Sequence, residues 1–339
     1  RAGVEVRTYP ERVGLVGRIL QLRDLYRRAA QVDADCYHCN EMDSWFIGVL
    51  LKLTRGKRVV FDVHEHYPST FSDSRFPQWS HPMIAAGVRL WVRLQLPFTD
   101  YVVLAKKSVA EEYRSARNIL LVQNFTPLWP SRARRNGSNR GNRVWAVHLG
   151  LISRLRGWPQ MLEALAHTTK DIGLWVIGTF NDGSRLQFDQ RARDLGLSER
   201  IRVEEWLPFD QVMERLFASH IGLVLFQPGV RNHVMASPHK IFDYMQAGLA
   251  VIAPDFAVEV AEVVRESGCG VLVNPADPVE IADALDRLAE HTSERTYMGQ
   301  AGRRAVEERY NWEAEGKKLV ELYREMSASA RQGSRVRSC

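Results

Sequence analysis

The sequence predicts an α/β protein with two domains, each a parallel sheet covered by helices on both faces. Strand-like and helix-like segments alternate along the chain, which is the order that builds parallel sheets. A length of 339 residues indicates two domains rather than one. A stretch rich in Arg, Asn, Gly and Ser between Leu128 and Arg143 has nothing to bury and divides the chain. We expect this stretch to be an interdomain linker.

The first residues of the chain match the second strand of a Rossmann-like domain and not its first strand. Residues 1–6 read as the end of a helix–strand connection and a second strand, without the buried strand and glycine turn that open a Rossmann-like domain. We therefore expect the first strand to be missing. A helix is expected from Val16 to Ala30, because Ile19, Leu22 and Tyr26 recur on one face. The other expected elements are strands at 35–39, 58–62, 101–104 and 119–122 and a helix at 43–53.

The second half opens with an apolar strand at 144–149, followed at once by Gly150. Asp210 is expected to cap a helix at 210–218. The other expected elements are strands at 174–178, 201–206, 221–226, 249–253 and 271–273 and helices from 159 and at 185–195, 278–289, 294–308 and 310–323. The predicted division is a first domain 1–130, a linker 131–143, a second domain 144–309, a terminal helix 310–326 and a disordered tail 327–339.

Residues 237–264 indicate an anion site. Pro238 suits the first turn of a helix, and Gly248 suits the left-handed residue that ends one. The apolar run 249–253 then suits a buried parallel strand. The free N–H groups and positive dipole end of such a helix attract anions. Ser237 and Lys240, at its start, are therefore expected near a bound phosphate.

Composition and charge limit the classes of molecule that the protein is expected to bind. The chain is 45% hydrophobic and 25% charged, as in ordinary globular proteins, with a formal net charge of +6. This basic excess is compatible with nucleic acid, anionic lipid or a phosphorylated substrate. No nucleic-acid-binding motif is recognised, so we expect no nucleic-acid partner. The four cysteines form no disulfide framework and no apolar run has the length of a membrane span, so we expect a cytoplasmic protein.

The segment PHKIFDYMQAG, followed by VIAPDF, Glu262 and GCGVLVNPADP, resembles the donor-binding half of the family-4 glycosyltransferases, retaining enzymes of glycosyl transferases group 1. The resemblance extends, in weaker detail, from about Val59 to Tyr323. It implies the glycosyltransferase B-type fold, in which two Rossmann-like domains face each other across a cleft. It also implies that the terminal helix crosses back to the acceptor-side first domain.

The stretch GLISRLRG, residues 150–157, is the first expected contact with a donor. A glycine after a buried strand lets the backbone approach a phosphate, and nearby arginines neutralise its charge. The resemblance implies that Gly150 and a following basic residue grip the leaving diphosphate. Arg156 matches that basic position best, and Arg154 is the second candidate.

Within the resemblance, Arg156 and Lys240 are the catalytic cations, and Ser237 holds phosphate oxygens. Asp243 stands where the family usually has a glutamate that binds the ribose. Met235 stands where the family has a second glutamate, which leaves the sugar-contacting group open. The substitutes considered are three loop residues, Arg231, Asn232 and His233. Glu262 aligns with a donor-side glutamate of the sub-group, with a purely structural role as the alternative.

The first domain carries the expected acceptor-side residues in DVHEHYP. His64 and Glu65 end a strand there, and the resemblance places a catalytic histidine near the reacting sugar. His66 is the rival within the same loop. Asp43 is a weaker acceptor-side candidate, with helix capping as the alternative.

A mixed apolar and basic segment from residue 89 to 98 has two readings. Its leucines, Trp91 and Phe98, with Arg89 and Arg93 beside them, suit a helix lying on a membrane surface. They suit better a helix that packs on the sheet with its arginines exposed. Peripheral contact at the inner membrane face is therefore the alternative to a purely cytoplasmic location.

The expected function is transfer of a hexose from a UDP- or GDP-linked sugar to an acceptor, with retention of configuration. No Asp-x-Asp metal motif stands out, so neither a metal nor a cofactor is expected. The acceptor class stays open between lipid-linked sugars, glycans and secondary metabolites. The alternatives are a nucleotide-sugar epimerase or hydrolase of the same fold and a degenerate, non-catalytic domain that binds a partner. A nicotinamide enzyme is disfavoured, because no strand is followed by G-x-G-x-x-G.

Overall fold

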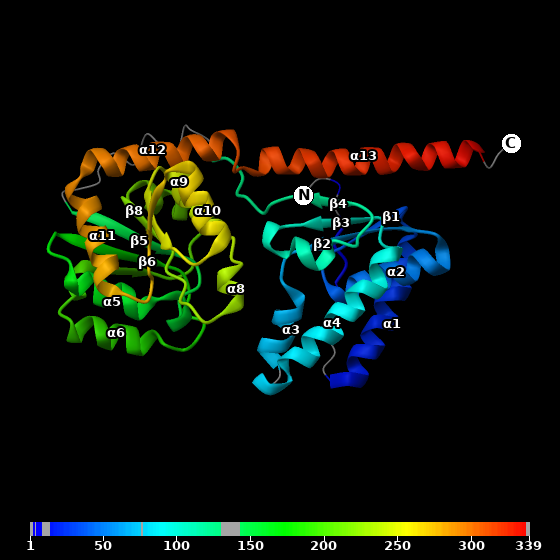
Figure 1. Cartoon of the computed structure of the whole chain (residues 1–339), viewed down its shortest axis with the longest axis horizontal. Helices are drawn as coiled ribbons and strands as arrows, with labels where there is room; N and C mark the ends of the chain where they lie inside the picture. The colour runs from blue at the N-terminus through cyan, green and yellow to red at the C-terminus, as the bar shows by residue number, and fades with distance from the viewer. Residues whose placement is uncertain (1–2, 4, 9–13, 76, 130–142, 337–339) are drawn as a thin grey trace. The chain divides into compact units, whose positions relative to one another are not determined.

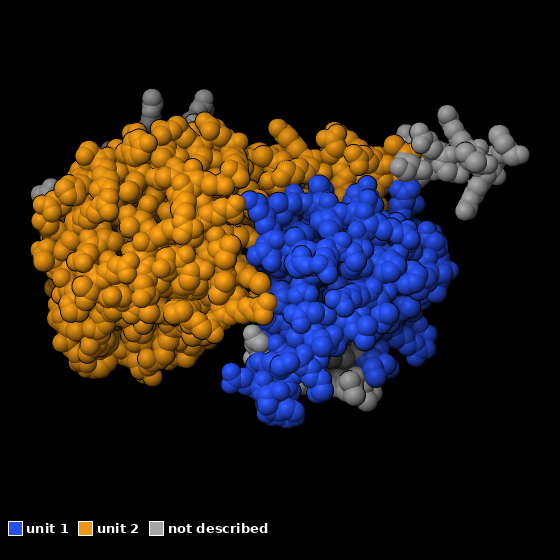
Figure 2. Space-filling model, viewed as in Figure 1, with its two compact units in different colours: residues 1–121 blue, residues 122–339 orange. Residues whose placement is uncertain are grey.

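The computed structural model describes residues 3, 5–8, 14–75, 77–129 and 143–336. It consists of two compact units, residues 1–121 and 122–339, which Figure 2 shows in different colours. Residues 122–129 therefore belong with the second unit, although the sequence predicted a boundary after residue 130. The predicted linker 131–143 lies outside the described residues except for Arg143.

The first unit is a sheet of four parallel strands in the order β1-β2-β3-β4. The strands are β1 (Cys36–Cys39), β2 (Arg58–Val63), β3 (Tyr101–Leu104) and β4 (Ile119–Leu121). The helices are α1 (Gly14–Val32), α2 (Met42–Arg55), α3 (Tyr67–Arg75) and α4 (His81–Gln95), with short 3-10 helices η1 (Gln78–Ser80), η2 (Leu96–Phe98) and η3 (Lys107–Tyr113). Residues 5–8 carry no strand, contrary to expectation. In the core, the indole of Trp45 stacks on the Phe61 ring with centroids 3.9 Å apart.

The second unit contains a six-stranded parallel sheet in the order β10-β9-β8-β5-β6-β7. Its strands are β5 (Val144–Leu149), β6 (Ile172–Ile177), β7 (Ile201–Glu204), β8 (Ile221–Leu223), β9 (Ala250–Pro254) and β10 (Gly270–Val273). Numbered within the unit, this is the doubly wound order of dinucleotide-binding folds. The direction of winding reverses between β5 and β8, which are direct neighbours.

Helices cover both faces of the second sheet, as Figure 1 shows for α9 and α12 on one side and α5 and α6 on the other. The helices of this unit are α5 (Trp158–His167), α6 (Arg185–Asp194), α7 (Phe209–Phe217), α8 (Arg231–Val234), α9 (His239–Ala247), α10 (Val258–Ser267), α11 (Pro278–Glu290), α12 (Thr292–Glu308) and α13 (Trp312–Val336), with 3-10 helices η5 (Arg154–Arg156) and η6 (Ser198–Arg200). Along β5, Val147 packs with residues of α7, α9 and α10, whereas Ala146 packs with residues of α5, α6 and α11. This alternation explains why β5 is apolar on both faces.

Two strand predictions, at 101–104 and 144–149, match β3 and β5 at both ends. Other predicted bounds differ by a few residues, and three differences concern a helix cap, a strand end and the tail. Helix α7 is preceded by Pro208 at the N-cap, so Asp210 lies in its first turn instead of capping it. Strand β8 ends at Leu223, three residues earlier than expected. The expected disordered tail is wrong for residues 327–336, which continue α13 to Val336, and residues 337–339 lie outside the described part.

A helix that crosses a membrane must be both long enough to span it and apolar along most of its length. Within the described ranges of this chain, no helix has both properties.

Candidate functional site

The carboxyl ends of β5 and β8 mark the point where the second sheet reverses its winding. Ligands of doubly wound sheets bind outside the strand ends at this point. Gly150 follows β5 directly, and the segment leading to Phe226 follows β8. The Tyr244 hydroxyl joins the two strand ends, because it accepts from the Leu149 N–H at 2.8 Å and donates to the Leu223 carbonyl at 3.3 Å. The segments that follow β5 and β8 therefore lie together at one edge of the second sheet.

Two cations meet at this edge. The guanidinium carbon of Arg156 lies 4.7 Å from the Phe226 ring centroid, and Nζ of Lys240 lies 5.8 Å from the same centroid. Lys240 is 8% exposed, and its Nζ has no hydrogen-bond partner among the described residues. The structure thus places Arg156, at the end of η5, and Lys240, in the first turn of α9, beside the same ring. A buried ammonium without a partner is ready to receive an anionic ligand.

The ionisable side chains around Phe226 have pKa values shifted from those of free side chains. Burial, with the positive charge of Arg156, lowers the pKa of Lys240 from 10.5 to about 7, against the opposing effect of Asp243. Burial likewise raises the pKa of Asp243 to about 7, although the Thr126 side chain and Lys240 act in the other direction. Burial also lowers the pKa of Arg156. Such shifts arise where charged groups have lost water and not yet gained a partner.

Two histidines border the cations. His148, on β5, is buried with Nε2 3.2 Å from the Leu151 carbonyl and with Nδ1 unpaired among the described residues. Burial, with the charges of Lys240 and Arg156, holds the pKa of His148 well below its usual range. His233, on α8, stacks on the Phe226 ring with centroids 5.0 Å apart, and burial together with Arg156 lowers its pKa. Both imidazoles are therefore neutral near pH 7.

Backbone geometry shapes the loop that carries Arg156. Ser153 caps η5 by accepting the Arg156 N–H at 3.2 Å. Gly157 then adopts φ +84°, and a Cβ there would lie 2.3 Å from the Leu225 carbonyl oxygen. Glycine is the residue that allows this approach, because it has no Cβ and tolerates a positive φ. Arg154 points elsewhere, with its guanidinium carbon 5.3 Å from the Trp158 ring centroid.

The remaining predicted donor residues lie around α9 and α10. Ser237 is half-buried and comes directly before Pro238, the N-cap of α9. Glu262 lies on α10, where its negative charge contributes to a raised pKa of Tyr310. Of the three substitutes considered for the missing glutamate, Arg231 and Asn232 are exposed, whereas His233 contacts Phe226.

In the first unit, one aspartate joins two histidines. Oδ2 of Asp62 lies 3.2 Å from Nε2 of His64 and 3.1 Å from Nε2 of His38. Burial alone would raise the pKa of Asp62, but the hydrogen bonds from His38 and His64 lower it to about 2. The Asp62 hydrogen bond in turn raises the pKa of His64, whose side chain is 44% exposed. His64 is thus held at the end of β2 with an accessible ring.

The predicted acceptor-side residues surround Glu41, which follows β1. Burial raises the pKa of Glu41, Glu65 and Asp43 raise it further, and His64 lowers it. The four side chains therefore form one electrostatic group. His66, the rival histidine, is 3% exposed, with its two ring nitrogens at Ser69 and Glu112. This arrangement supports a structural role for His66 and leaves His64 as the accessible histidine. Asp43 lies in the first turn of α2, whose N-cap is Glu41.

Sequence reasoning missed several members of both groups: His38, Glu41, Asp62, His148, Phe226 and Gln227. Gln227 accepts from His233 through its carbonyl at 2.8 Å and thereby fixes the ring against Phe226. Most of these residues end or follow a parallel strand, and that position was the signal available in the sequence.

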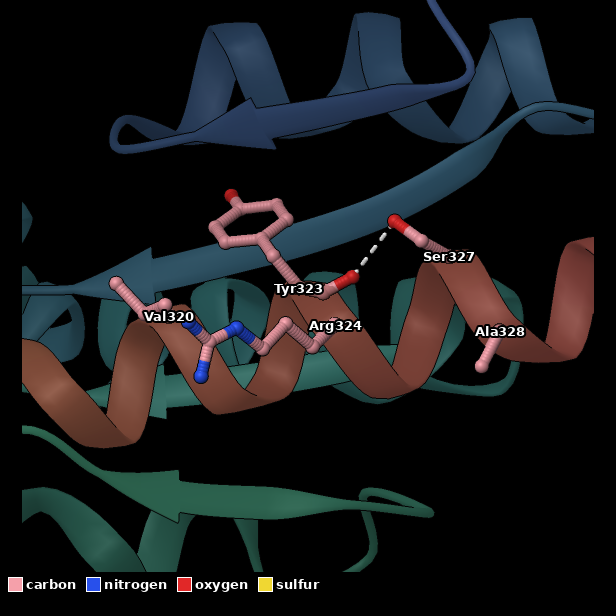
Figure 3. A pocket seen from close by; sticks show the side chains of 5 residues that line it. All are labelled: Val320, Tyr323, Arg324, Ser327 and Ala328. Carbon is pink, nitrogen blue, oxygen red and sulfur yellow. Dashed lines mark hydrogen bonds between the residues drawn. The ribbon is translucent and has the colours of Figure 1, made fainter.

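A hollow along α13 is a weaker candidate. Figure 3 shows the five residues that line it, Val320, Tyr323, Arg324, Ser327 and Ala328. The Ser327 hydroxyl is used within the helix, where it donates to the Tyr323 carbonyl at 2.8 Å. With one cation and little converging polarity, this lining lacks the chemistry of the Phe226 cluster.

Comparison with known proteins points to the same part of the chain. Residues 145–291 match the family model described as glycosyl transferases group 1. A curated relative, D-inositol 3-phosphate glycosyltransferase of Corynebacterium urealyticum, is 26% identical over 200 residues, which cover 55% of this chain and 44% of the relative. The chain thus matches less than half the length of that relative.

Solved structures extend the likeness to the whole fold. A crystal structure of Anabaena Alr3699/HepE in complex with UDP has a TM-score of 0.71 at 15% identity and covers 91% of this chain and 84% of that chain. Sucrose-phosphate synthase (tll1590) from Thermosynechococcus elongatus has a TM-score of 0.73 at 18% identity, with 91% and 78% covered. Both units therefore share the Rossmann-like fold of these solved structures.

Proposed function

We propose that this chain, whose residues 145–291 belong to glycosyl transferases group 1, transfers a sugar from a nucleotide-diphosphate donor to an acceptor with retention of configuration. One observation carries the proposal furthest. The buried, unpartnered ammonium of Lys240 and the guanidinium of Arg156 meet over Phe226 at the reversal point of the second sheet. This is the place and the charge that a diphosphate requires.

The difficult step is cleavage of the bond between C1 of the sugar and the diphosphate oxygen. Negative charge then grows on the leaving diphosphate, and fixed cations stabilise it more than they stabilise the intact donor. Arg156, Lys240 and the N–H groups at the start of α9 would supply this stabilisation. C1 then bonds to the acceptor oxygen, and the acceptor proton passes to the leaving diphosphate. The reaction as proposed needs neither a cofactor nor a metal.

His64 is proposed to contact the acceptor or the reacting sugar. Its ring is accessible and is held by Asp62. Glu65, Asp43 and the newly found Glu41 would supply polar contacts around it. We place the enzyme in the cytoplasm and leave the acceptor open between lipid-linked, glycan and small-molecule classes.

A binding experiment tests the donor site directly. UDP and UDP-glucose are titrated into the full chain by calorimetry first, because solved structures of Anabaena Alr3699/HepE contain them. GDP is titrated next. UMP, which lacks the second phosphate of UDP, is the comparison ligand. We expect a diphosphate to bind at least tenfold more tightly than the monophosphate. Equal binding of both, or of neither, would argue against the proposal.

A second candidate function rests on Met235, which stands where the resemblance implies a glutamate: a degenerate domain that binds a nucleotide sugar without turnover. Release of UDP from UDP-sugars, assayed with a panel of acceptors, separates the two functions. Acceptor-dependent release supports transfer. Release without any acceptor would indicate a hydrolase, and tight binding without release would indicate the degenerate domain.

A further inference from the structure

Helix α4 presents an apolar surface that the described part of the chain leaves largely exposed, although the Trp91 ring also packs against Phe46 of α2, with centroids 5.3 Å apart. The exposed fractions are 66% for Met83, 59% for Leu90, 41% for Trp91 and 61% for Leu94, and Trp79 in the preceding turn is 80% exposed. At ~100° per residue the four side chains on α4 fall on one arc of about 100°, and Trp79 precedes them in η1. We call this set, Trp79, Met83, Leu90, Trp91 and Leu94, the α4 stripe. Scattered exposed leucines are ordinary, but a continuous stripe marks a contact surface.

The opposite face of the same helix packs into the core of the first unit. Val92 is 3% exposed, Gln95 is 5% exposed, and Leu96 just beyond the helix is 1% exposed. Helix α4 therefore has two apolar faces, one packed in the unit and one open. The sequence alone favoured a single packed face with exposed arginines, and the exposures show that this interpretation was wrong for the leucines at 90 and 94.

The charges beside the α4 stripe are predominantly positive, because Arg89, Arg93 and Arg114 line one hollow with Glu111 and Glu112, which pair with Arg114 and Arg89. Residues 76–99 contain Arg89 and Arg93 but no Asp or Glu. Arg89 pairs with Glu112 at 3.1 Å, whereas Arg93 makes no hydrogen bond or ion pair with any described residue. Arg93 is exposed at the border of the stripe. A free cation beside apolar and indole side chains matches the headgroup region of an anionic lipid layer.

We propose that the α4 stripe docks on a membrane surface that contains anionic lipid, with Trp79 and Trp91 at the level of the headgroups and Arg93 on a lipid phosphate. Tryptophan prefers this depth because its ring is apolar and its N–H is polar. A second copy of the chain fits less well. A symmetric interface would place the same basic border against itself, and the neighbouring carboxylates, Glu112 and Glu111, are already paired with Arg89 and Arg114.

Vesicle co-sedimentation tests the docking. The full chain is mixed with vesicles of phosphatidylcholine and phosphatidylglycerol (about 7:3) and with vesicles of phosphatidylcholine alone. We expect binding to the anionic vesicles that weakens severalfold when salt rises from about 0.1 to 0.5 M, because salt screens Arg93. Leu90→Asp/Leu94→Asp should lower the partition coefficient at least tenfold. Leu186→Asp is the matched control, because Leu186 is 80% exposed on α6 and also follows an arginine.

A second measurement does not depend on the double variant folding. Brominated phosphatidylcholine quenches tryptophan that enters the acyl boundary. Quenching should occur in the wild type and largely disappear in Trp79→Phe/Trp91→Phe, which keeps the apolar stripe. Absence of binding to anionic vesicles would overturn the proposal, as would equal binding by the Leu186→Asp and Leu90→Asp/Leu94→Asp variants. A doubled solution mass that the same double variant abolishes would overturn it in favour of a second copy.

Discussion

The side chains of Arg156 and Lys240 share one aromatic ring, that of Phe226, although 84 residues separate them along the chain. Each is drawn out of water at the same strand edge, and the charge of Arg156 lowers the pKa of Lys240. Two cations so close, without a carboxylate bonded to either among the described residues, repel each other until an anion binds. This pair is where we propose that the two adjacent phosphates of the donor bind.

Removing either cation should weaken nucleotide diphosphate binding. Arg156→Ala and Lys240→Ala each remove a charge-assisted contact, which is worth ~1.5–3 kcal/mol or about 10- to 100-fold in Kd. Calorimetry with UDP measures the change. Arg191→Ala, which removes a surface cation paired with Glu163, is the control and should leave Kd unchanged. Loss of less than twofold in both site variants would contradict the site.

Binding should also take up a proton above pH 7. The pKa of Lys240 is about 7 in the free protein, so its amine is largely neutral at pH 8. A bound diphosphate favours the ammonium, and Kd should therefore rise with pH by up to about tenfold per unit. Calorimetry at pH 8 in two buffers with different ionisation enthalpies counts the protons. Lys240→Arg, which stays charged, should abolish the uptake, and equal heats in both buffers for the wild type would refute it.

Asp243→Asn should stabilise the protein increasingly from pH 4 to 7. The pKa of Asp243 is raised from 3.8 to about 7, so the folded state holds a proton that the unfolded chain releases. Wild-type stability therefore falls across this window, by at most ~1.4 kcal/mol per pH unit, and the variant lacks this loss. Urea unfolding at pH 4, 5.5 and 7 measures the difference. Asp210→Asn, at an exposed position on α7, should give a difference without this trend.

Asp62→Asn should lower the pKa of His64 toward 6.5. The Asp62 hydrogen bond is the main cause of the raised value, and the charge of Glu41 contributes least. Glu41→Gln should therefore produce a smaller decrease. An NMR titration of the His64 ring gives both values. If Asp62→Asn leaves the His64 titration where it was, Asp62 does not hold the ring.

Gly157→Ala should destabilise the second unit far more than Gly183→Ala. Both glycines have positive φ, +84° and +71°, so each alanine carries backbone strain of about 1 kcal/mol. Only at Gly157 does the added Cβ also meet a carbonyl oxygen, whereas nothing lies within 4 Å at Gly183. We expect a loss of more than ~3 kcal/mol or failure to express for Gly157→Ala. Similar denaturation midpoints for the two variants would show that the loop relaxes.

Local patterns predicted most of the secondary structure. The strand at 144–149 is apolar at nearly every position because both of its faces are buried, and Gly248 ends α9 in the left-handed conformation at φ +73°. The tail was mispredicted because residues 327–336 are polar, yet they extend a helix that begins at Trp312. Polar composition lowers burial without preventing a helix from continuing.

By itself, the sequence determined the alternation of strands and helices, the family resemblance, and the cations expected at a phosphate. Only the tertiary structure decided which neighbours change the chemistry of those residues. Phe226 and His148 lie beside Arg156 and Lys240 because neighbouring strands of the second sheet end together. Asp62 and Glu41 lie near His64 for the same reason in the first sheet. The pKa shifts of Lys240 and Asp243 come mainly from burial. The open face of α4 was decided in the same way, because exposure depends on what packs against a helix and not on the order of its residues.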